Sequence, residues 1–227
     1  MPEFLDRFAP STRVLHWLVA IPVLILMLTG LTNFWPEAKT LHLGGARIFA
    51  WLHVLLGLGF AVALLPSLLA IFSRRAARRD ARELLLVRLD DYLWLQHRAL
   101  RAAGLRSIAP RVGKFNAGQK VNAALATTAI IVLIGTGVVL GVNFWNKNVF
   151  DVDLVAAVFR WHTVLSLLLL PLIVGHLYMA ALNPETRESL RGMTSGRVRR
   201  AWAERHHDAW AERAREASRR GAGPDRR

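Results

Sequence analysis

The sequence contains no cysteine. This absence excludes disulfides, cysteine-ligated iron–sulfur clusters and covalently attached c-type haem, so a redox centre in this chain would need other ligands, histidine above all. Acidic residues are also few: 16 Asp and Glu stand against 30 Lys and Arg in 227 residues, a formal charge of +14. Nucleic-acid-binding proteins and membrane proteins both carry such an excess, so the positions of the charges must decide between the two classes.

Charge is almost absent from four long apolar stretches. Each has roughly the 20 residues that a helix needs to cross the hydrocarbon core of a bilayer, where the backbone must satisfy its own hydrogen bonds. The sequence therefore predicts an all-α protein, an integral membrane four-helix bundle formed by residues 1–182. The expected spans are 14–35, 48–72, 119–142 and 154–182. Because Glu3 and Asp6 precede the first span and no small-residue cleavage site follows it cleanly, we expect this span to be retained rather than removed as a signal peptide.

The positive charges gather in two segments. Residues 73–118 carry eleven Arg and Lys and residues 183–227 carry twelve Arg, whereas the other two loops hold only Lys39, Arg47 and Lys147. The positive-inside rule then places both termini and the 73–118 loop in the cytoplasm, with the spans in a bacterial inner membrane. This placement accounts for nearly all of the net charge, so we expect no nucleic-acid partner.

The two basic segments are predicted to be helical. The 73–118 loop has the pattern of amphipathic helices lying against the membrane lipids at the cytoplasmic interface. Residues 183–227 are expected to form a basic cytoplasmic tail that is helical at first and disordered at its end. A solvated or headgroup-bound surface explains both segments, and docking of a partner protein is the alternative.

Four of the eight histidines lie inside or at the edge of the expected spans: His16, His53, His162 and His176. Ionisable residues are costly in membrane helices and usually have a function there. With both termini in the cytoplasm, His53 and His162 share the periplasmic depth, and His16 and His176 share the cytoplasmic depth. Each pair could hold a haem iron between two neutral imidazoles.

The fourth span presents two of these histidines on one face. His162 and His176 are fourteen residues apart, which corresponds to about 21 Å of helical rise and a return to within roughly 40° of the same face. The sequence therefore predicts two b haems at two depths. A shared zinc site is excluded for these two residues by their separation, and a proton path would normally bring Asp or Glu into the spans, where there is none.

Arginines near the ends of the spans are candidate partners for haem propionates. They are Arg13, Arg47 and Arg160. A guanidinium group pairs well with a carboxylate, so one such residue beside each pair of histidines would help to hold the porphyrin.

Several motifs together identify a family resemblance. They are RVLHW at residues 13–17, the fourteen-residue separation of His162 and His176, GKFNAGQK at 113–120, and RGMTSGRVRRAWAERHH at 191–207. With these motifs, over nearly its whole length, the chain resembles the gamma (cytochrome b) subunit of membrane-bound formate dehydrogenase, within the wider membrane cytochrome b561 and hydrogenase-type family.

The resemblance implies a function and a set of partners. In that family the gamma subunit accepts electrons from an iron–sulfur beta subunit, which is fed by a molybdenum- or tungsten-containing alpha subunit where formate is oxidised. The electrons cross two b haems and reduce menaquinone or ubiquinone near the cytoplasmic side. The resemblance matches His53 and His162 to the periplasmic haem ligands and His16 and His176 to the cytoplasmic ones, and it assigns no catalytic residue to this chain.

The resemblance also places a quinone site at FNAGQK. Asn116 and Gly118 match positions that line this site, with Gln119 beside them and His176 nearby. A helix amino terminus favours developing negative charge, an amide can donate to a quinone oxygen, and glycine permits close approach. Without the resemblance, the segment is an ordinary polar helix start with Asn116 as its N-cap.

Two other functions remain compatible with the sequence. The chain could serve a different complex, such as a hydrogenase, a thiosulfate reductase or another molybdoenzyme, although FNAGQK and the tail motif favour formate dehydrogenase. It could also be a haem-free membrane anchor or a small transporter.

Overall fold

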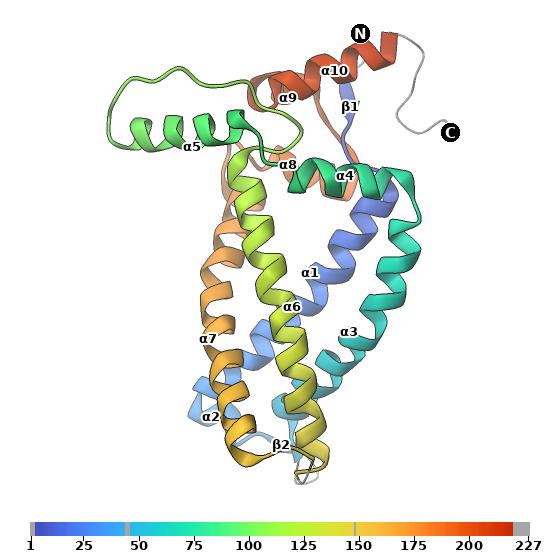
Figure 1. Ribbon diagram of the computed structural model, residues 1–227, viewed down its shortest axis with the longest axis vertical. Coiled ribbons are helices and arrows are strands. Elements are labelled where there is room, and N and C mark those ends of the chain that lie inside the picture. The colour runs from blue at the N-terminus through green and yellow to red at the C-terminus, as the bar shows by residue number, and fades with distance from the viewer. Residues whose placement is uncertain (1–2, 44–45, 148, 220–227) are drawn as a thin grey trace. The chain divides into compact units, whose positions relative to one another are not determined.

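The computed structural model describes residues 3–43, 46–147 and 149–219 and is mostly helical (Figure 1). The chain divides into two compact units. The apolar unit comprises residues 15–70 and 126–174, and the basic unit comprises residues 1–14, 71–125 and 175–227. All but four of the Lys and Arg residues belong to the basic unit; the four exceptions are Lys39, Arg47, Lys147 and Arg160.

Four helices are long and apolar enough to cross a membrane, within the described residues. They are α1 (Pro10–Leu31), α3 (Ile48–Phe72), α6 (Ala117–Trp145) and α7 (Val152–Leu177), the last continuing through a π-helical turn at Tyr178–Leu182. The helices α1, α6 and α7 begin a few residues before the expected spans, whereas α3 coincides with the expected 48–72. The chain is thus a multi-pass membrane protein.

The shorter elements lie between and after these helices. In chain order they are β1 (Phe4–Asp6), a 3₁₀ turn (Thr32–Phe34), α2 (Pro36–Lys39), β2 (His42–Leu43), β3 (Ala46–Arg47), α4 (Arg75–Leu85), α5 (Leu89–Ala102), α8 (Glu188–Thr194), β4 (Arg197–Arg199), α9 (Arg200–His206) and α10 (Asp208–Arg219).

The core of the apolar unit is assembled from all four long helices. Val23 of α1, Phe60 of α3 and Leu169 of α7 are its buried residues. The helix α6 adds half-buried side chains at positions 126, 129, 130, 133 and 134, the spacing of one helical face. Further along this face, a Cβ at Gly141 would lie 3.0 to 3.1 Å from three side-chain atoms of Leu58, so glycine allows α6 to approach α3 closely.

The basic unit is built on a pair of strands from distant parts of the sequence. The strand β1 pairs antiparallel with β4, and Leu5 lies opposite Val198. Both residues are buried in a small core with side chains of α9 and α10, which are Trp202, Ala203, Trp210 and Ala211. The expected boundary at residue 182 stays a prediction, and so does disorder at the end of the tail, because residues 220–227 lie outside the described residues.

Gly196 closes the connection between α8 and β4. Its φ of +85° is a left-handed conformation, and its carbonyl accepts hydrogen bonds from the backbone N–H groups of Arg7 (2.8 Å) and Phe8 (3.1 Å). A Cβ at this position would lie 2.9 Å from the Phe8 carbonyl oxygen. Backbone atoms cannot move aside as a flexible side chain can, so only glycine fits here.

We therefore expect Gly196→Ala to destabilise the basic unit by about 2 kcal/mol or more, since it adds a backbone clash to the strain of a positive φ. Gly104→Ala is the matched control, because Gly104 has a φ of +77° but nothing within 4 Å of its added Cβ. This control should cost only about 1 kcal/mol. Thermal unfolding in detergent, followed by tryptophan fluorescence, measures both losses. Equal losses in the two variants would contradict the close contact at Gly196.

Candidate functional site

Two of the predicted histidines face each other within the apolar unit. His53 of α3 and His162 of α7 are both half-buried, and their ring centroids lie 6.2 Å apart at an interplanar angle of 84°. The long helices thus bring together residues that are more than a hundred positions apart in the sequence.

A threonine holds each of these two rings. The Nδ1 atom of His53 lies 3.0 Å from Oγ1 of Thr29 on α1, and the Nδ1 atom of His162 lies 2.9 Å from Oγ1 of Thr136 on α6. In both cases the residue after the threonine is a glycine that faces the same ring: a Cβ at Gly30 would lie 3.3 Å from Cε1 of His53. Because Nδ1 of each ring is engaged, Nε2 is the atom left for an external ligand.

The spacing of the two rings suits an iron ion between them. Two imidazoles that bind one metal ion at about 2 Å per bond need ring centroids about 6 Å apart, and this pair is 6.2 Å apart. Within the described ranges no three His, Cys, Asp or Glu side chains gather into a metal cluster. Two facing imidazoles without further protein ligands fit a haem, whose porphyrin supplies the other four nitrogens.

The other two predicted ligands belong to different units. His16, in the apolar unit, is half-buried on α1 with its ring edge-on to Trp17 at 5.1 Å. His176, in the basic unit, is exposed in the last turn of α7. Their pairing stays a prediction.

The three predicted propionate partners have different surroundings. The Nη1 group of Arg13 donates to the carbonyl of Thr194 at the end of α8 (2.6 Å), so α8 already holds this guanidinium. Arg47 lies in β3 and Arg160 on α7, and both are exposed. Their role toward a haem stays a prediction.

The FNAGQK segment starts α6 with a reciprocal cap. The Oδ1 atom of Asn116 accepts from the backbone N–H of Gln119 (2.9 Å), and Oε1 of Gln119 accepts from the backbone N–H of Asn116 (3.0 Å). This is the geometry of a capping box, with amides in place of the usual hydroxyl and carboxylate. Since both side-chain oxygens bind the backbone, the cap turns the two NH₂ groups away from it, and they are the donors that the segment can offer to a ligand.

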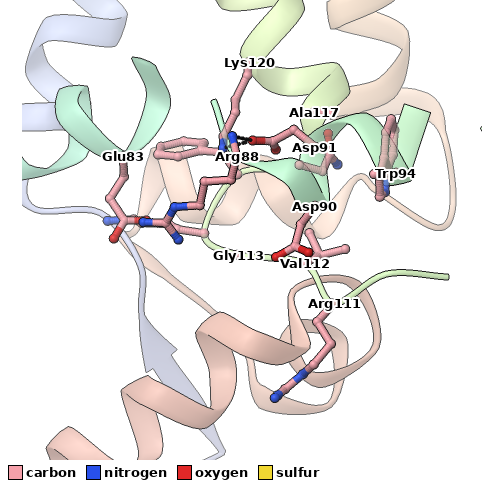
Figure 2. Close-up of a pocket in the computed structure, with 13 residues that line it drawn as sticks. Glu83, Arg88, Asp90, Asp91, Trp94, Arg111, Val112, Gly113, Ala117 and Lys120 are labelled. Atoms are coloured by element: carbon pink, nitrogen blue, oxygen red, sulfur yellow. Dashed lines mark hydrogen bonds and ion pairs between the residues drawn. The ribbon is translucent and has the colours of Figure 1, made fainter. Parts of the chain in front are cut away.

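The same segment docks the helix α5. A Cβ at Gly118 would lie 3.3 Å from the indole of Trp94, so the missing side chain makes room for this ring. The Nζ group of Lys120 donates to Asp91 (2.7 Å) and to the carbonyl of Leu86 (2.8 Å), and Figure 2 shows the contact between Lys120 and Asp91. Gly118 therefore contacts a tryptophan in this structure.

A small cavity of about 30 Å³ adjoins Asn116 (Figure 2). It is lined by Glu83, Arg88, Asp90, Asp91, Trp94, Arg111, Val112, Gly113, Lys114, Phe115, Asn116, Ala117 and Lys120. Small-molecule sites usually measure about 300 Å³ or more, so this cavity has room for water but not for a quinone ring.

The chain segment that leads into Asn116 is held by the tail. His207 is 2% exposed; its Nδ1–H donates to the carbonyl of Gly113 (2.8 Å), and its Nε2 accepts from Nη2 of Arg7 (2.9 Å). Arg7 also donates to the carbonyl of Lys114 (2.9 Å). The carboxylate of Asp208 accepts from the backbone N–H of Val112 (2.7 Å). The tail motif that ends at His207 thus helps to position the start of α6.

The surroundings of Arg7 are aromatic. Its guanidinium carbon lies 5.1 to 5.6 Å from the ring centroids of Phe8, Trp202 and Trp210, within the range of cation–π attraction. Lys114, whose carbonyl accepts from Arg7, forms a buried ion pair with Asp80. The carboxylate of Asp80 also accepts from the hydroxyl of Thr12 (2.8 Å). Buried charges are costly unless paired, and Lys114 and Asp80 meet this requirement as an ion pair. Arg7 is held by backbone carbonyl, imidazole and aromatic groups instead, and burial lowers its pKa to about 9.

Sequence reasoning missed Thr29, Thr136, Arg7 and His207. A threonine hydroxyl carries no charge, so it does not stand out among the apolar residues of a span as a histidine does. The signal for the threonines was the Thr-Gly dipeptide, which occurs once in α1 and once in α6 at residues 29–30 and 136–137. No local pattern marks Arg7 and His207, because their contact joins the two ends of the chain.

Four apolar helices that present facing imidazoles define a multi-pass membrane protein of the b-cytochrome class. The comparison with known families agrees: the chain belongs to the prokaryotic cytochrome b561 family, whose sequence pattern matches residues 7–196. Binding of b-type haem and a part in electron transport follow from this membership.

Relatives of known identity are subunits of formate dehydrogenases. The cytochrome b556(Fdn) subunit of the nitrate-inducible formate dehydrogenase of Escherichia coli K12 is 27% identical over 197 residues, which cover 86% of this chain and 84% of the relative. The formate dehydrogenase cytochrome b556 subunit of Haemophilus influenzae is 24% identical over 88% and 79% of the two chains. The cytochrome b556(fdo) subunit of Escherichia coli K12 is 22% identical over 95% and 96%.

The contact between Arg7 and His207 predicts a pH dependence of the basic unit. Burial, and then the charge of Arg7, lower the pKa of His207 to about 3. The unfolded value is about 6.5, so the folded state favours neutral His207. This contribution to stability is therefore complete above about pH 6.5 and is lost progressively as the pH falls toward about 3.

We expect His207→Gln to flatten this pH dependence, because a glutamine amide can still donate to Gly113 and accept from Arg7 but does not titrate. The measurement is the midpoint of urea unfolding between pH 7.5 and 4, followed by tryptophan fluorescence, to which Trp202 and Trp210 beside His207 contribute. Other groups titrate equally in both proteins, so the difference between them isolates His207. Parallel curves for the two proteins would contradict the assignment.

Proposed function

We propose that this chain is the electron-transfer subunit of a respiratory formate dehydrogenase complex. In this proposal it carries electrons from an iron–sulfur subunit, itself supplied by a molybdenum or tungsten subunit, through two b haems to menaquinone or ubiquinone. The facing pair of His53 and His162, each with a threonine on Nδ1, is the observation that carries the proposal. The names of the relatives support the formate dehydrogenase partner.

The histidines would hold the two haems at two depths. His53 and His162 would bind one iron through Nε2, and His16 and His176 would bind the other. When bound, haem supplies a site that is reversibly reduced by one electron. The fourteen residues between His162 and His176 correspond to about 21 Å along the helix. Two haems held by this one helix would therefore lie at two depths, and an electron would pass from one haem to the other.

The basic unit would face the cytoplasm of a bacterial inner membrane. The positive-inside rule supports this orientation, because the basic unit carries all but four of the Lys and Arg residues. The amphipathic helices α4 and α5 would then lie at the cytoplasmic interface with lipid, and both termini would be cytoplasmic.

The quinone would bind at the start of α6, near Asn116, Gly118, Gln119 and His176. The reciprocal cap supports this placement, since it leaves the amide NH₂ groups of Asn116 and Gln119 to donate. A donor at this place stabilises the negative charge that develops on a quinone oxygen during reduction. The cavity of about 30 Å³ is too small for the ring, so entry would displace Trp94 from Gly118.

Replacement of the ligands tests the haem assignment. We expect His53→Ala and His162→Ala each to remove the same haem, and His16→Ala and His176→Ala each to remove the other, since an iron with one axial histidine is held weakly. Haem per chain, measured on the purified complex, should fall from two to one. His97→Ala is the control, because His97 lies on α5 and binds Ser107.

Retention of two haems after any one of the four replacements would sink the assignment of that residue. Co-purification with a hydrogenase or another molybdoenzyme instead of formate dehydrogenase would overturn the choice of complex but leave the haem assignment intact.

Two replacements of Asn116 distinguish its role as a hydrogen-bond donor to quinone from its role as the N-cap of α6. Asn116→Asp keeps an oxygen for the backbone N–H of Gln119 but lacks the NH₂ group, whereas Asn116→Leu loses both. If the NH₂ group of Asn116 donates a hydrogen bond to the quinone, both variants should reduce quinone at least about tenfold more slowly. Both haems should remain reducible by the iron–sulfur subunit. A slow Asn116→Leu beside a normal Asn116→Asp would show that Asn116 acts only as the cap.

A further inference from the structure

We propose that Thr29 and Thr136 are positioning residues that hold His53 and His162 with the proton on Nδ1, so that the lone pair of Nε2 is the one that would bind the haem iron. The inference rests on the proposed function, in which these two histidines bind one haem iron. It adds to that function the two residues that decide which ring nitrogen is offered to the iron.

The hydroxyl protons of the two threonines are engaged within their own helices. A threonine hydroxyl has a single proton, and in Thr29 it is donated within α1, to the carbonyls of Ile25 (2.9 Å) and Leu26 (3.1 Å). In Thr136 it is donated within α6, to the carbonyls of Val132 (2.8 Å) and Leu133 (3.2 Å). Each oxygen is therefore left as an acceptor, and the histidine nitrogen beside it must be the donor.

A hydrogen bond from Nδ1 selects one tautomer of the histidine. A neutral imidazole carries one N–H, so a proton on Nδ1 leaves the lone pair on Nε2. A metal-bound histidine generally donates its other N–H to an acceptor, which fixes both the tautomer and the orientation of the ring. The distances of 3.0 Å to Thr29 and 2.9 Å to Thr136 are those of full hydrogen bonds.

The glycine after each threonine lies against the same histidine ring. A Cβ at Gly30 would lie 3.3 Å from Cε1 of His53, and a Cβ at Gly137 would lie 3.4 Å from Cε1 of His162. Each ring thus rests against bare helix backbone on one side while its Nδ1 binds the preceding threonine. The glycine sets how closely the ring approaches the helix, and the threonine sets which way it turns.

The same arrangement occurs twice. A Thr-Gly dipeptide on α1 serves the histidine of α3, and a Thr-Gly dipeptide on α6 serves the histidine of α7. In both cases the dipeptide lies on the long helix that comes before the histidine in the chain. An iron between the two rings would receive two imidazoles in the same tautomer, each with a neutral acceptor behind it.

The acceptor also affects the iron. A hydrogen bond from Nδ1–H makes the imidazole a stronger electron donor, which favours the oxidised metal. Loss of the hydroxyl should therefore raise the midpoint potential of the haem held by His53 and His162 and should weaken its retention. Loss of such an outer partner typically weakens metal binding by about 10- to 100-fold.

Four variants of the full complex test the inference. Thr29→Val and Thr136→Val remove the hydroxyl at nearly constant volume, and Thr29→Ser and Thr136→Ser restore it. Thr127→Val is the matched control, because Thr127 is an exposed residue of the same helix α6. The readouts are haem per chain, the rate at which haem passes to excess apomyoglobin, and the midpoint potentials from an optical redox titration.

We expect each valine variant to lose haem about tenfold faster or more and to shift one of the two potentials upward, while the serine variants and Thr127→Val match the parent protein. Circular dichroism and assembly with the partner subunits check that each variant folds. If a valine variant does not assemble, Thr29→Ala or Thr136→Ala replaces it, since alanine also lacks the hydroxyl but is smaller than valine.

The outcomes separate the inference from the function on which it rests. Parent protein without a haem that depends on His53 and His162 overturns the proposed function and this inference together. A parent protein with that haem, beside valine variants that keep the parent's haem transfer rate and potentials, overturns the inference alone.

Discussion

A polar side chain inside a membrane helix has no water to bind, so its partner must come from the protein. In the apolar unit this constraint falls on His53 and His162, and a hydroxyl from a neighbouring helix meets it in both cases. The hydroxyl in turn is satisfied by its own helix, one turn earlier. Each ring is thus tied to a second helix as well as its own, and about two turns further along the same helices the packing of Val23, Phe60 and Leu169 holds them together.

Hydropathy predicts the four long helices well because the signal is strong and local. Each is an apolar run of sufficient length, and the structure shifts their ends by only a few residues. The sequence also allows the pairing of His53 with His162 to be predicted, since the depth of a residue in the membrane follows from its position in the helix. The role of the threonines could not be predicted in this way, because a hydroxyl carries no charge. Its partner also depends on how two helices turn toward each other.

At the start of α6, too, local features follow from the sequence and contacts between distant segments do not. Asn116 as an N-cap follows from local chemistry, and its reciprocal partner Gln119 lies three residues away. The contact of Gly118 with Trp94 does not follow, since it joins separate helices. The pairing of Leu5 with Val198 is further still from any local signal, because nearly the whole chain lies between the two residues.

The strand pair has a consequence for synthesis in the cell. The strand partner of β1 is β4, and Trp202 and Trp210, which contact Arg7, belong to α9 and α10. These elements leave the ribosome after all four long helices. Until then the amino-terminal strand has no partner, and the segment before α6 lacks the bonds from His207 and Asp208. The core of the basic unit therefore cannot be completed before the tail is made, and a chain that stops short of its tail lacks most of this core and leaves β1 unpaired.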